Sequence, residues 1–204
     1  MIKNIIFDIG NVLFKYDPDH ITTSLLPHTK FKQFYIEHLF MSDIWQNLDR
    51  GDITKNKALA ILKKTFNLNQ SQENELQTLI SNFPKHLILN EKIKKIFCAL
   101  AEQFDIYILS NFQSMPFKLL LKDHPFLQLA KGIIISNDVL MKKPELGIYH
   151  YLLTKYSLTP EKTIFIDDLE ENIISAKRLL IHGIHYKSST QLIKELAKLS
   201  IHSH

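Results

Sequence analysis

The sequence predicts an α/β fold, in which a Rossmann-like parallel sheet carries helices on both faces and a small all-helical cap is inserted near the N-terminus. Three observations support this prediction. From about residue 87 onward, short apolar runs alternate with helical stretches, as in repeated βαβ units. These runs lack polar alternation, which is typical of strands that are covered on both faces. One more such run opens the chain, and about 70 residues of helical pattern separate it from the rest.

The run IIFDIGNVLF, at residues 5–14, predicts the first buried strand. Its first apolar part ends on Asp8. A carboxylate at the end of a buried strand is costly to desolvate unless a partner compensates for its charge. An aspartate after a strand can also cap a helix or form a turn, so Asp8 alone does not define a site.

Helices are expected to follow this strand. Asp17 and Pro18 form the cap-then-proline pattern that is typical of a helix start. Helical spacing continues to about residue 85, and Ser71 is the expected cap of the last of these helices. Apolar or compatible side chains at this spacing are Ala58, Ile61, Leu62, Thr65, Phe66, Leu76, Leu79, Ile80 and Phe83. We therefore expect a helical cap at residues 15–86, and a core formed by residues 1–14 and 87–204.

The second core segment begins with an apolar helical stripe at residues 93–100. Strands are then expected at DIYILSN, GIIISND, TIFIDD and IHY, which are residues 105–111, 132–138, 163–168 and 184–186. Three helices are expected after GIIISND. The first is ELGIYHYLLTKY, the second lies between the last two strands and ends before Gly183, and the third lies near residues 190–199. The order predicts parallel strands that are joined by helical crossovers.

Polar side chains stand at the expected carboxyl ends of four strands. In open parallel sheets, ligands bind outside these ends. We therefore expect these residues to meet at one edge of the sheet. They are Asp8, then Ser110 with Asn111, then Lys142 and Lys143, which precede Pro144, and finally Asp167 with Asp168.

Three carboxylates that share a partly desolvated site repel one another unless a cation joins them. Magnesium fits this requirement, because it binds oxygen ligands and keeps free positions for substrate phosphate. Ser110 and Lys143 could then hold a phosphate group. Each residue alone could instead serve as a cap, turn or exposed loop residue, and it is their combination that predicts a site for Mg²⁺ and phosphate.

Composition narrows the function classes. The net charge is +4, but the lysines are scattered among glutamates, so we expect no nucleic-acid partner. No apolar run reaches the roughly 20 residues of a membrane span, so no membrane partner is expected. The single cysteine, Cys98, excludes an internal disulfide and, without a signal pattern, favours a cytoplasmic protein. The isolated glycines form no dinucleotide or Walker-type loop. The sequence leaves the oligomeric state open.

Four segments together resemble the haloacid dehalogenase-like superfamily, in its phosphatase-like branch with a helical cap after the first strand. They are FDIGNVLF, ILSNF, KKPELGIY and IFIDDLEENIISAK, in the expected order, and WQNLDRGDIT resembles the cap of that branch. The resemblance implies an Mg²⁺-dependent hydrolase of a small phosphorylated metabolite. The first motif is similar to that of sugar-phosphate phosphatases.

The resemblance also implies roles at matching positions. Asp8 would be the nucleophile, which forms an aspartyl phosphate that water then hydrolyses. Mg²⁺ would bind a carboxylate oxygen of Asp8, the backbone carbonyl of Gly10, and Asp168, with Asp167 reaching it directly or through water. Asn172 would support the acidic loop.

The phosphoryl group would have its own contacts. The resemblance implies that Ser110 and the backbone amide of Asn111 hydrogen-bond this group. Lys143 would balance charge on both the nucleophile and the phosphoryl oxygens. Asp8, Lys143 and Ser110 are thus the expected catalytic residues, and Ser110, Asn111 and Lys143 the expected substrate-binding residues.

One position departs from the family pattern. Many of these phosphatases have a second aspartate two residues after the nucleophile, which acts as general acid and base, and here that position is Gly10. The enzyme could use a substrate with a good leaving group, such as a sugar 1-phosphate, or another group or water could replace the acid. Loss of catalysis would leave a non-catalytic binding protein. A metal-independent 2-haloacid dehalogenase is a further alternative. Gly10 could also serve a tight turn with positive φ.

Overall fold

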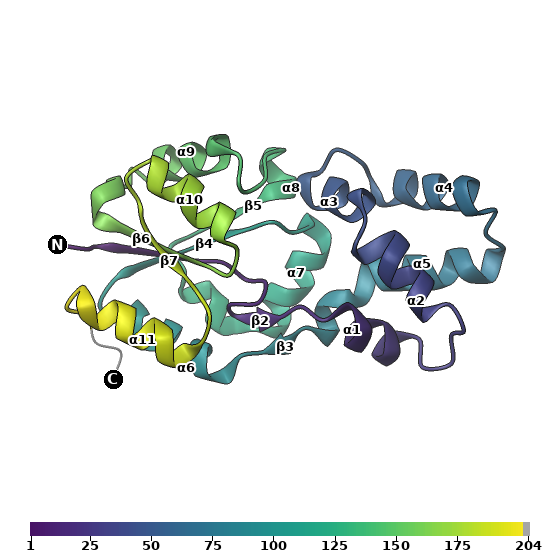
Figure 1. Ribbon diagram of the computed structural model, residues 1–204, viewed down its shortest axis with the longest axis horizontal. Helices are drawn as coiled ribbons and strands as arrows, with labels where there is room; N and C mark the ends of the chain where they lie inside the picture. The colour runs from purple at the N-terminus through teal and green to yellow at the C-terminus, as the bar shows by residue number, and fades with distance from the viewer. Residues whose placement is uncertain (202–204) are drawn as a thin grey trace.

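The computed structural model describes residues 1–201 and contains a five-stranded parallel sheet in the order β5-β4-β1-β6-β7. The prediction of an α/β fold with a parallel sheet is confirmed. The first strand lies in the middle of the sheet, between β4 and β6, so both of its edges are paired (Figure 1). Its carboxyl end therefore lies at the middle of the edge formed by the carboxyl ends of the strands. The strands are β1 (Asn4–Phe7), β4 (Asp105–Ser110), β5 (Gly132–Ile135), β6 (Thr163–Asp167) and β7 (His182–His185).

Helices cover both faces of the sheet (Figure 1). Successive side chains of a strand point to opposite faces. Ile5 and Phe7 accordingly join the large core cluster with α6 and α11, whereas Ile6 joins a second cluster with α9 and α10. Because each face is covered, the strands carry no polar alternation. The helices are α6 (Glu91–Ala101), α9 (Leu146–Lys155), α10 (Glu170–Arg178) and α11 (Ser189–Lys198).

A helical cap lies between the first two core strands in the sequence. Its elements are α1 (Pro18–Leu25), α2 (Lys32–Tyr35), a π-helix (Ile36–Phe40), α3 (Asp43–Arg50), α4 (Lys55–Phe66), α5 (Gln70–Asn82) and a 3₁₀ helix (Phe83–His86). The expected start of α1 is confirmed, because the Asp17 side chain accepts a hydrogen bond from the His20 amide at 3.1 Å. The expected cap of α5 is wrong. Asn69 caps it in a reciprocal capping box with Gln72, and Ser71 lies inside the first turn.

The chain leaves and re-enters the core through a two-stranded antiparallel ribbon that the sequence analysis missed. It consists of β2 (Phe14–Lys15) and β3 (Ile88–Leu89). Two-residue strands carry too little pattern to be predicted. Because these paired strands mark where the helices begin and end, we propose residues 15–86 as the cap and the rest of the chain as the core.

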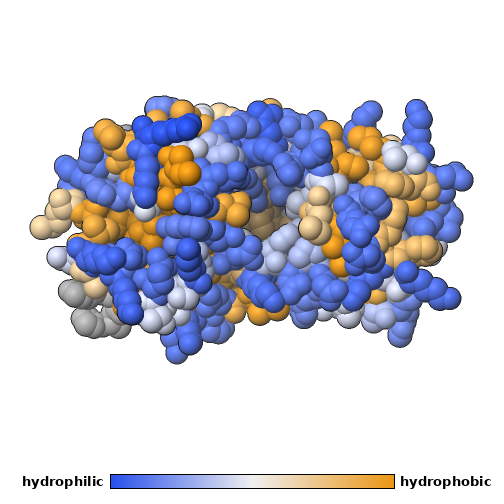
Figure 2. Space-filling view, viewed as in Figure 1, coloured by the Kyte–Doolittle hydropathy of each residue, from blue (hydrophilic) through white to orange (hydrophobic). Residues whose placement is uncertain are grey.

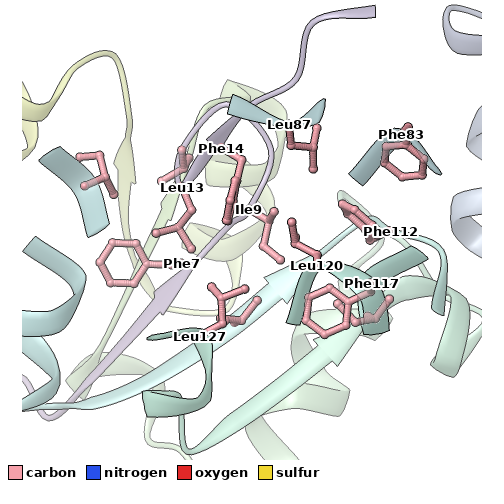
Figure 3. Close-up of a cluster of buried hydrophobic side chains, with 14 of the residues drawn as sticks. Phe7, Ile9, Leu13, Phe14, Phe83, Leu87, Phe112, Phe117, Leu120 and Leu127 are labelled. Atoms are coloured by element: carbon pink, nitrogen blue, oxygen red, sulfur yellow. The ribbon is translucent and has the colours of Figure 1, made fainter. Parts of the chain in front are cut away.

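Cap and core share one hydrophobic cluster. Figure 3 shows Phe83, from the end of the cap, beside Phe112, with Leu87, Phe117 and other core side chains in the same cluster. The ring centroids of Phe83 and Phe112 are 5.2 Å apart. This continuous packing fixes the cap over the carboxyl ends of the strands, and Figure 2 shows a surface hollowed between the core on the left and the cap on the right.

Polar contacts join α3 of the cap to α8 (Ser136–Val139), which follows β5. The Asn137 amide donates to the Leu48 carbonyl at 2.8 Å, so a core side chain satisfies a carbonyl at the end of a cap helix. Gly51 ends α3 in the left-handed conformation, with φ of 88°. An added Cβ there would lie 2.8 Å from Leu140 and 3.0 Å from the Asn137 carbonyl. Only glycine allows this turn and this close approach. Among residues 1–201, no helix is both long and apolar enough to cross a membrane.

Candidate active site

The carboxyl ends of β1 and β6 bring three acids together. Asp8 directly follows β1, Asp167 ends β6, and Asp168 follows it. One carboxylate oxygen from each lies within 4.8 Å of the others. The two strands pair in register, and the Asp8 amide donates to the Ile166 carbonyl at 3.0 Å. The sheet register therefore sets the spacing of the acids.

Lys143 crosses this acidic cluster from the loop after β5. Its Nζ lies 2.7 Å from Asp8 Oδ1 and 2.6 Å from Asp167 Oδ2. The Lys143 and Asp167 side chains are 2% and 0% exposed, so these ion pairs are shielded from water. The distances place the ammonium group between the two carboxylates, where it neutralises part of their charge.

The pKa values show that Lys143 alone does not balance the site. Burial raises the pKa of Asp8 well above its ordinary value, and the charges of Asp167 and Asp168 add to the rise, while Lys143 lowers it. Burial also raises the pKa of Asp168. Burial alone would lower the pKa of Lys143, but the two carboxylates that it contacts raise it. A further cation would favour the charged forms of Asp8 and Asp168.

Two asparagines hold the acids in place. The Asn11 side-chain amide donates to Asp168 Oδ2 at 3.1 Å, and that of Asn172 donates to Asp167 Oδ1 at 2.9 Å. Asp167 Oδ1 also accepts from the Leu169 amide at 2.8 Å. Asn172 Oδ1 is buried and has no hydrogen-bond partner among residues 1–201. The acidic loop is therefore oriented from both sides.

The turn after Asp8 corrects one sequence expectation. Asn11, with φ of 52°, carries the positive backbone angle, and Gly10 is not in the left-handed region. Asparagine tolerates this conformation better than other non-glycine residues. The positive-φ explanation for Gly10 is therefore wrong.

Ser110 and Asn111 lie at the end of β4, which is the neighbour of β1. Ser110 is buried, at 2% exposure. The Asn111 side chain forms two hydrogen bonds with the backbone of Lys143, donating to its carbonyl at 2.9 Å and accepting from its amide at 2.8 Å. The peptide bond between Lys143 and Pro144 is cis. Asn111 thus links the loop after β4 to the lysine loop, a role that the sequence analysis did not predict.

The donor set fits a hard divalent cation. Three carboxylates supply only oxygen ligands, they lie close together, and their charge exceeds what Lys143 neutralises. Such a set suits Mg²⁺ or another oxygen-preferring cation, and no cysteine or histidine belongs to it.

Sequence analysis missed two polar residues between cap and core. Gln113, just after the Ser110 segment, donates from Nε2 to Oδ1 of Asp49 in α3 at 3.2 Å. Burial raises the pKa of Asp49 to about 8, although the hydrogen bond from Gln113 and the charge of Lys142 both lower it. Arg50, the next residue in α3, pairs with Glu145 at 2.8 Å. No motif marks Asp49, because its position depends on how the cap packs.

A cavity of about 480 Å³ lies beside this contact, between α3, α4 and α5 of the cap and α7 (Ser114–Asp123) of the core. Gln113, three residues after Ser110 in the chain, is one of its lining residues. Most of its lining surface is apolar. The apolar lining side chains are Leu48, Ile53, Ile80, Met115, Pro116 and Leu119.

The fold and this edge of the sheet define a hydrolase class. A family model described as haloacid dehalogenase-like hydrolase matches residues 5–185, and the chain belongs to this family. The resemblance in the four sequence segments is thereby confirmed. The fold agrees with a HAD family enzyme from Bacteroides thetaiotaomicron that was solved with magnesium and inorganic phosphate. Its TM-score is 0.75 at 22% identity, over 92% of this chain and 95% of that one.

Two fungal relatives are also similar along nearly the whole chain. Sesquiterpene phosphatase astK of Aspergillus oryzae is 26% identical over 97% of this chain and 96% of its own length. Drimenol cyclase drtB of Aspergillus calidoustus is 25% identical over 98% of this chain. The chain spans only 37% of the length of that cyclase.

Proposed function

We propose that this protein is an Mg²⁺-dependent phosphatase that hydrolyses a small phosphate monoester through an aspartyl phosphate on Asp8. The observation that carries the proposal is the buried cluster in which Lys143 contacts both Asp8 and Asp167, with Asp168 beside them. The phosphatase among the relatives and the magnesium and phosphate in the Bacteroides enzyme support it.

Each side chain has a proposed task. One carboxylate oxygen of Asp8 attacks phosphorus, while Lys143 balances charge on Asp8 and on the phosphoryl oxygens. Ser110 and the backbone amide of Asn111 hydrogen-bond the phosphoryl group. Asp8, the carbonyl of Gly10, Asp167 and Asp168 are the proposed ligands of Mg²⁺. When bound, the ion neutralises negative charge on the phosphoryl oxygens.

Two substrate classes are open to test. The first motif resembles sugar-phosphate phosphatases, which favours a sugar phosphate. The apolar cavity favours a second class, phosphate monoesters of apolar alcohols, because Leu48, Ile80 and Met115 would contact a hydrocarbon chain but offer nothing to sugar hydroxyls. The similarity to a sesquiterpene phosphatase supports the second class.

Phosphate release tests the function and the substrate class together. The purified protein is incubated with glucose 1-phosphate, farnesyl phosphate or 4-nitrophenyl phosphate, with Mg²⁺ or with EDTA. We expect turnover of at least one ester with Mg²⁺ and none with EDTA. Asp8→Asn should abolish it, and Asp123→Asn, an exposed change on α7, should preserve it.

Other outcomes identify the alternatives. Equal turnover by Asp8→Asn and wild type would exclude Asp8 as nucleophile. Mg²⁺-dependent binding of a phosphate mimic, without hydrolysis of any ester, would indicate a non-catalytic binding protein. Metal-independent halide release from chloroacetate would indicate a dehalogenase.

A further inference from the structure

The proposed reaction requires a proton for the leaving oxygen, and the nucleophile loop does not supply it. Gly10 occupies the position where many relatives have an aspartate. A Cβ added at Gly10 would meet no heavy atom within 4 Å among the described residues, so this side of the loop is open space. An alkoxide is a poor leaving group, and a positioned acid is commonly worth about 10² to 10⁴ in rate.

Asp49, near the C-terminal end of α3, is approached by the two core segments that follow β4 and β5, and by Tyr16 at the start of the cap. Its Oδ1 accepts from Gln113, three residues after Ser110, and its backbone carbonyl accepts from Ser136 Oγ at 2.5 Å. Lys142, next to Lys143, is near enough for its charge to lower the pKa of Asp49. Asp49 is thus contacted by the segments after β4 and β5, the same segments that carry Ser110, Asn111 and Lys143.

Tyr16, which follows β2 at the start of the cap, is connected to the nucleophile loop. The Tyr16 amide donates to Asn11 Oδ1 at 3.1 Å, which links Tyr16 to the asparagine that holds Asp168. The Tyr16 hydroxyl is buried and has no hydrogen-bond partner among residues 1–201. Burial raises its pKa, and the charge of Asp49 raises it further, so the two groups are close. A buried hydroxyl without a partner indicates that a ligand or water completes this space.

The surroundings of Asp49 favour its protonated form at neutral pH. Burial raises its pKa to about 8. The groups that face it are the Gln113 amide, the Lys142 ammonium and the Tyr16 hydroxyl. The neighbouring guanidinium of Arg50 is occupied by Glu145 and Asp52, at 2.8 and 2.6 Å. Asp49 can therefore donate a proton without a strong ion pair to hold it ionised.

We propose that Asp49 is the general acid and base of the reaction, supplied by the cap in place of the side chain that Gly10 lacks. This inference rests on the proposed function. As Asp8 forms its bond to phosphorus, the ester P–O bond breaks and its electron pair goes to the leaving oxygen, which takes the proton from Asp49. The Asp49 carboxylate then accepts a proton from the water that attacks phosphorus, and Asp8 is released as a carboxylate.

Leaving-group dependence tests this role. The probes are 4-nitrophenyl phosphate, whose leaving oxygen is weakly basic, and 4-nitrobenzyl phosphate, whose leaving oxygen is strongly basic. We expect Asp49→Asn to lower kcat/KM about 10²-fold for the nitrobenzyl ester and less than about threefold for the nitrophenyl ester. With the nitrophenyl ester, kcat should fall and a burst of nitrophenolate should appear, because the base for the second step is also lost. Asp43→Asn, an exposed change in the same helix, should retain both activities.

Equal losses of kcat/KM on both esters, or no loss on either, would overturn the role of Asp49. A melting curve shows whether Asp49→Asn folds. The wild-type pH profile gives a test without any variant: kcat/KM for the nitrobenzyl ester should fall above about pH 8, and parallel profiles for the two esters would overturn the inference. If wild type with Mg²⁺ hydrolyses neither these two esters nor glucose 1-phosphate or farnesyl phosphate, the proposed function fails first, and the inference falls with it.

Discussion

Removing the Lys143 ammonium should destabilise the protein in a way that Mg²⁺ repairs. The side chain lies 2.7 Å from Asp8 and 2.6 Å from Asp167, and all three side chains are at most 9% exposed. Deleting one partner of a buried ion pair leaves an uncompensated charge and commonly costs about 3–5 kcal/mol. For a chain of this length, 1 kcal/mol corresponds to roughly 2–4 °C in Tm, so Lys143→Met without Mg²⁺ should melt on the order of 10 °C below wild type.

The assay is thermal or urea unfolding with EDTA and again with saturating Mg²⁺. Added Mg²⁺ should recover most of the loss, because the cation replaces the missing positive charge among the carboxylates. Lys142→Met is the matched control, since the Lys142 ammonium donates to the Gln46 side chain in an exposed hydrogen bond of 2.8 Å, and its loss should cost under about 1 kcal/mol. If Lys143→Met unfolds within 1 kcal/mol of wild type in EDTA, the buried charges do not control stability in the way argued.

Three further predictions concern the metal, the cap and pH. Mg²⁺ at about 100 times its Kd should stabilise wild type by about 2.7 kcal/mol, and Asp168→Asn should lose most of this rise in Tm. Gly51→Ala should lower the free energy of unfolding in urea by at least about 1–2 kcal/mol, because alanine disfavours φ of 88° and its Cβ would meet Leu140. Unchanged stability would contradict the observed turn. The folded protein holds the Asp49 proton more tightly than the unfolded chain does, so protonated Asp49 contributes to the free energy of unfolding. This contribution is complete below about pH 4 and is lost as pH rises through about 8. The Tm of Asp49→Asn relative to wild type should therefore increase over that range, and a constant difference would refute the raised pKa.

Much of the fold follows from local pattern. The strands are apolar throughout because helices cover both sheet faces, and this property is visible in the sequence without any structure. The start of α1 at Asp17 and Pro18 was predicted from cap chemistry alone. Ser71 was misassigned because Asn69 and Ser71 are both good caps, and only the side-chain reach of Gln72 decides between them.

The sequence also indicated that Asp8, Lys143, Asp167 and Asp168 would lie together, since carboxyl ends of parallel strands share one edge of the sheet. The structure brings these four residues together. Their catalytic and metal-binding roles remain predictions. The two-residue strands β2 and β3 were missed, because so few residues carry no recognisable period.

The sequence by itself determined the sheet, the helical insertion and the acidic edge, because each depends on periodicity and on strand order. Only the tertiary structure decided the surroundings of Asp49, the apolar cavity, and the buried hydroxyl of Tyr16, which has no hydrogen-bond partner within residues 1–201. The contact between Asp49 and Gln113 joins residues 64 positions apart in the chain, and the cavity also lies between cap helices and a distant core helix. Burial and charge at such contacts depend on packing between distant segments, and no local pattern records that packing.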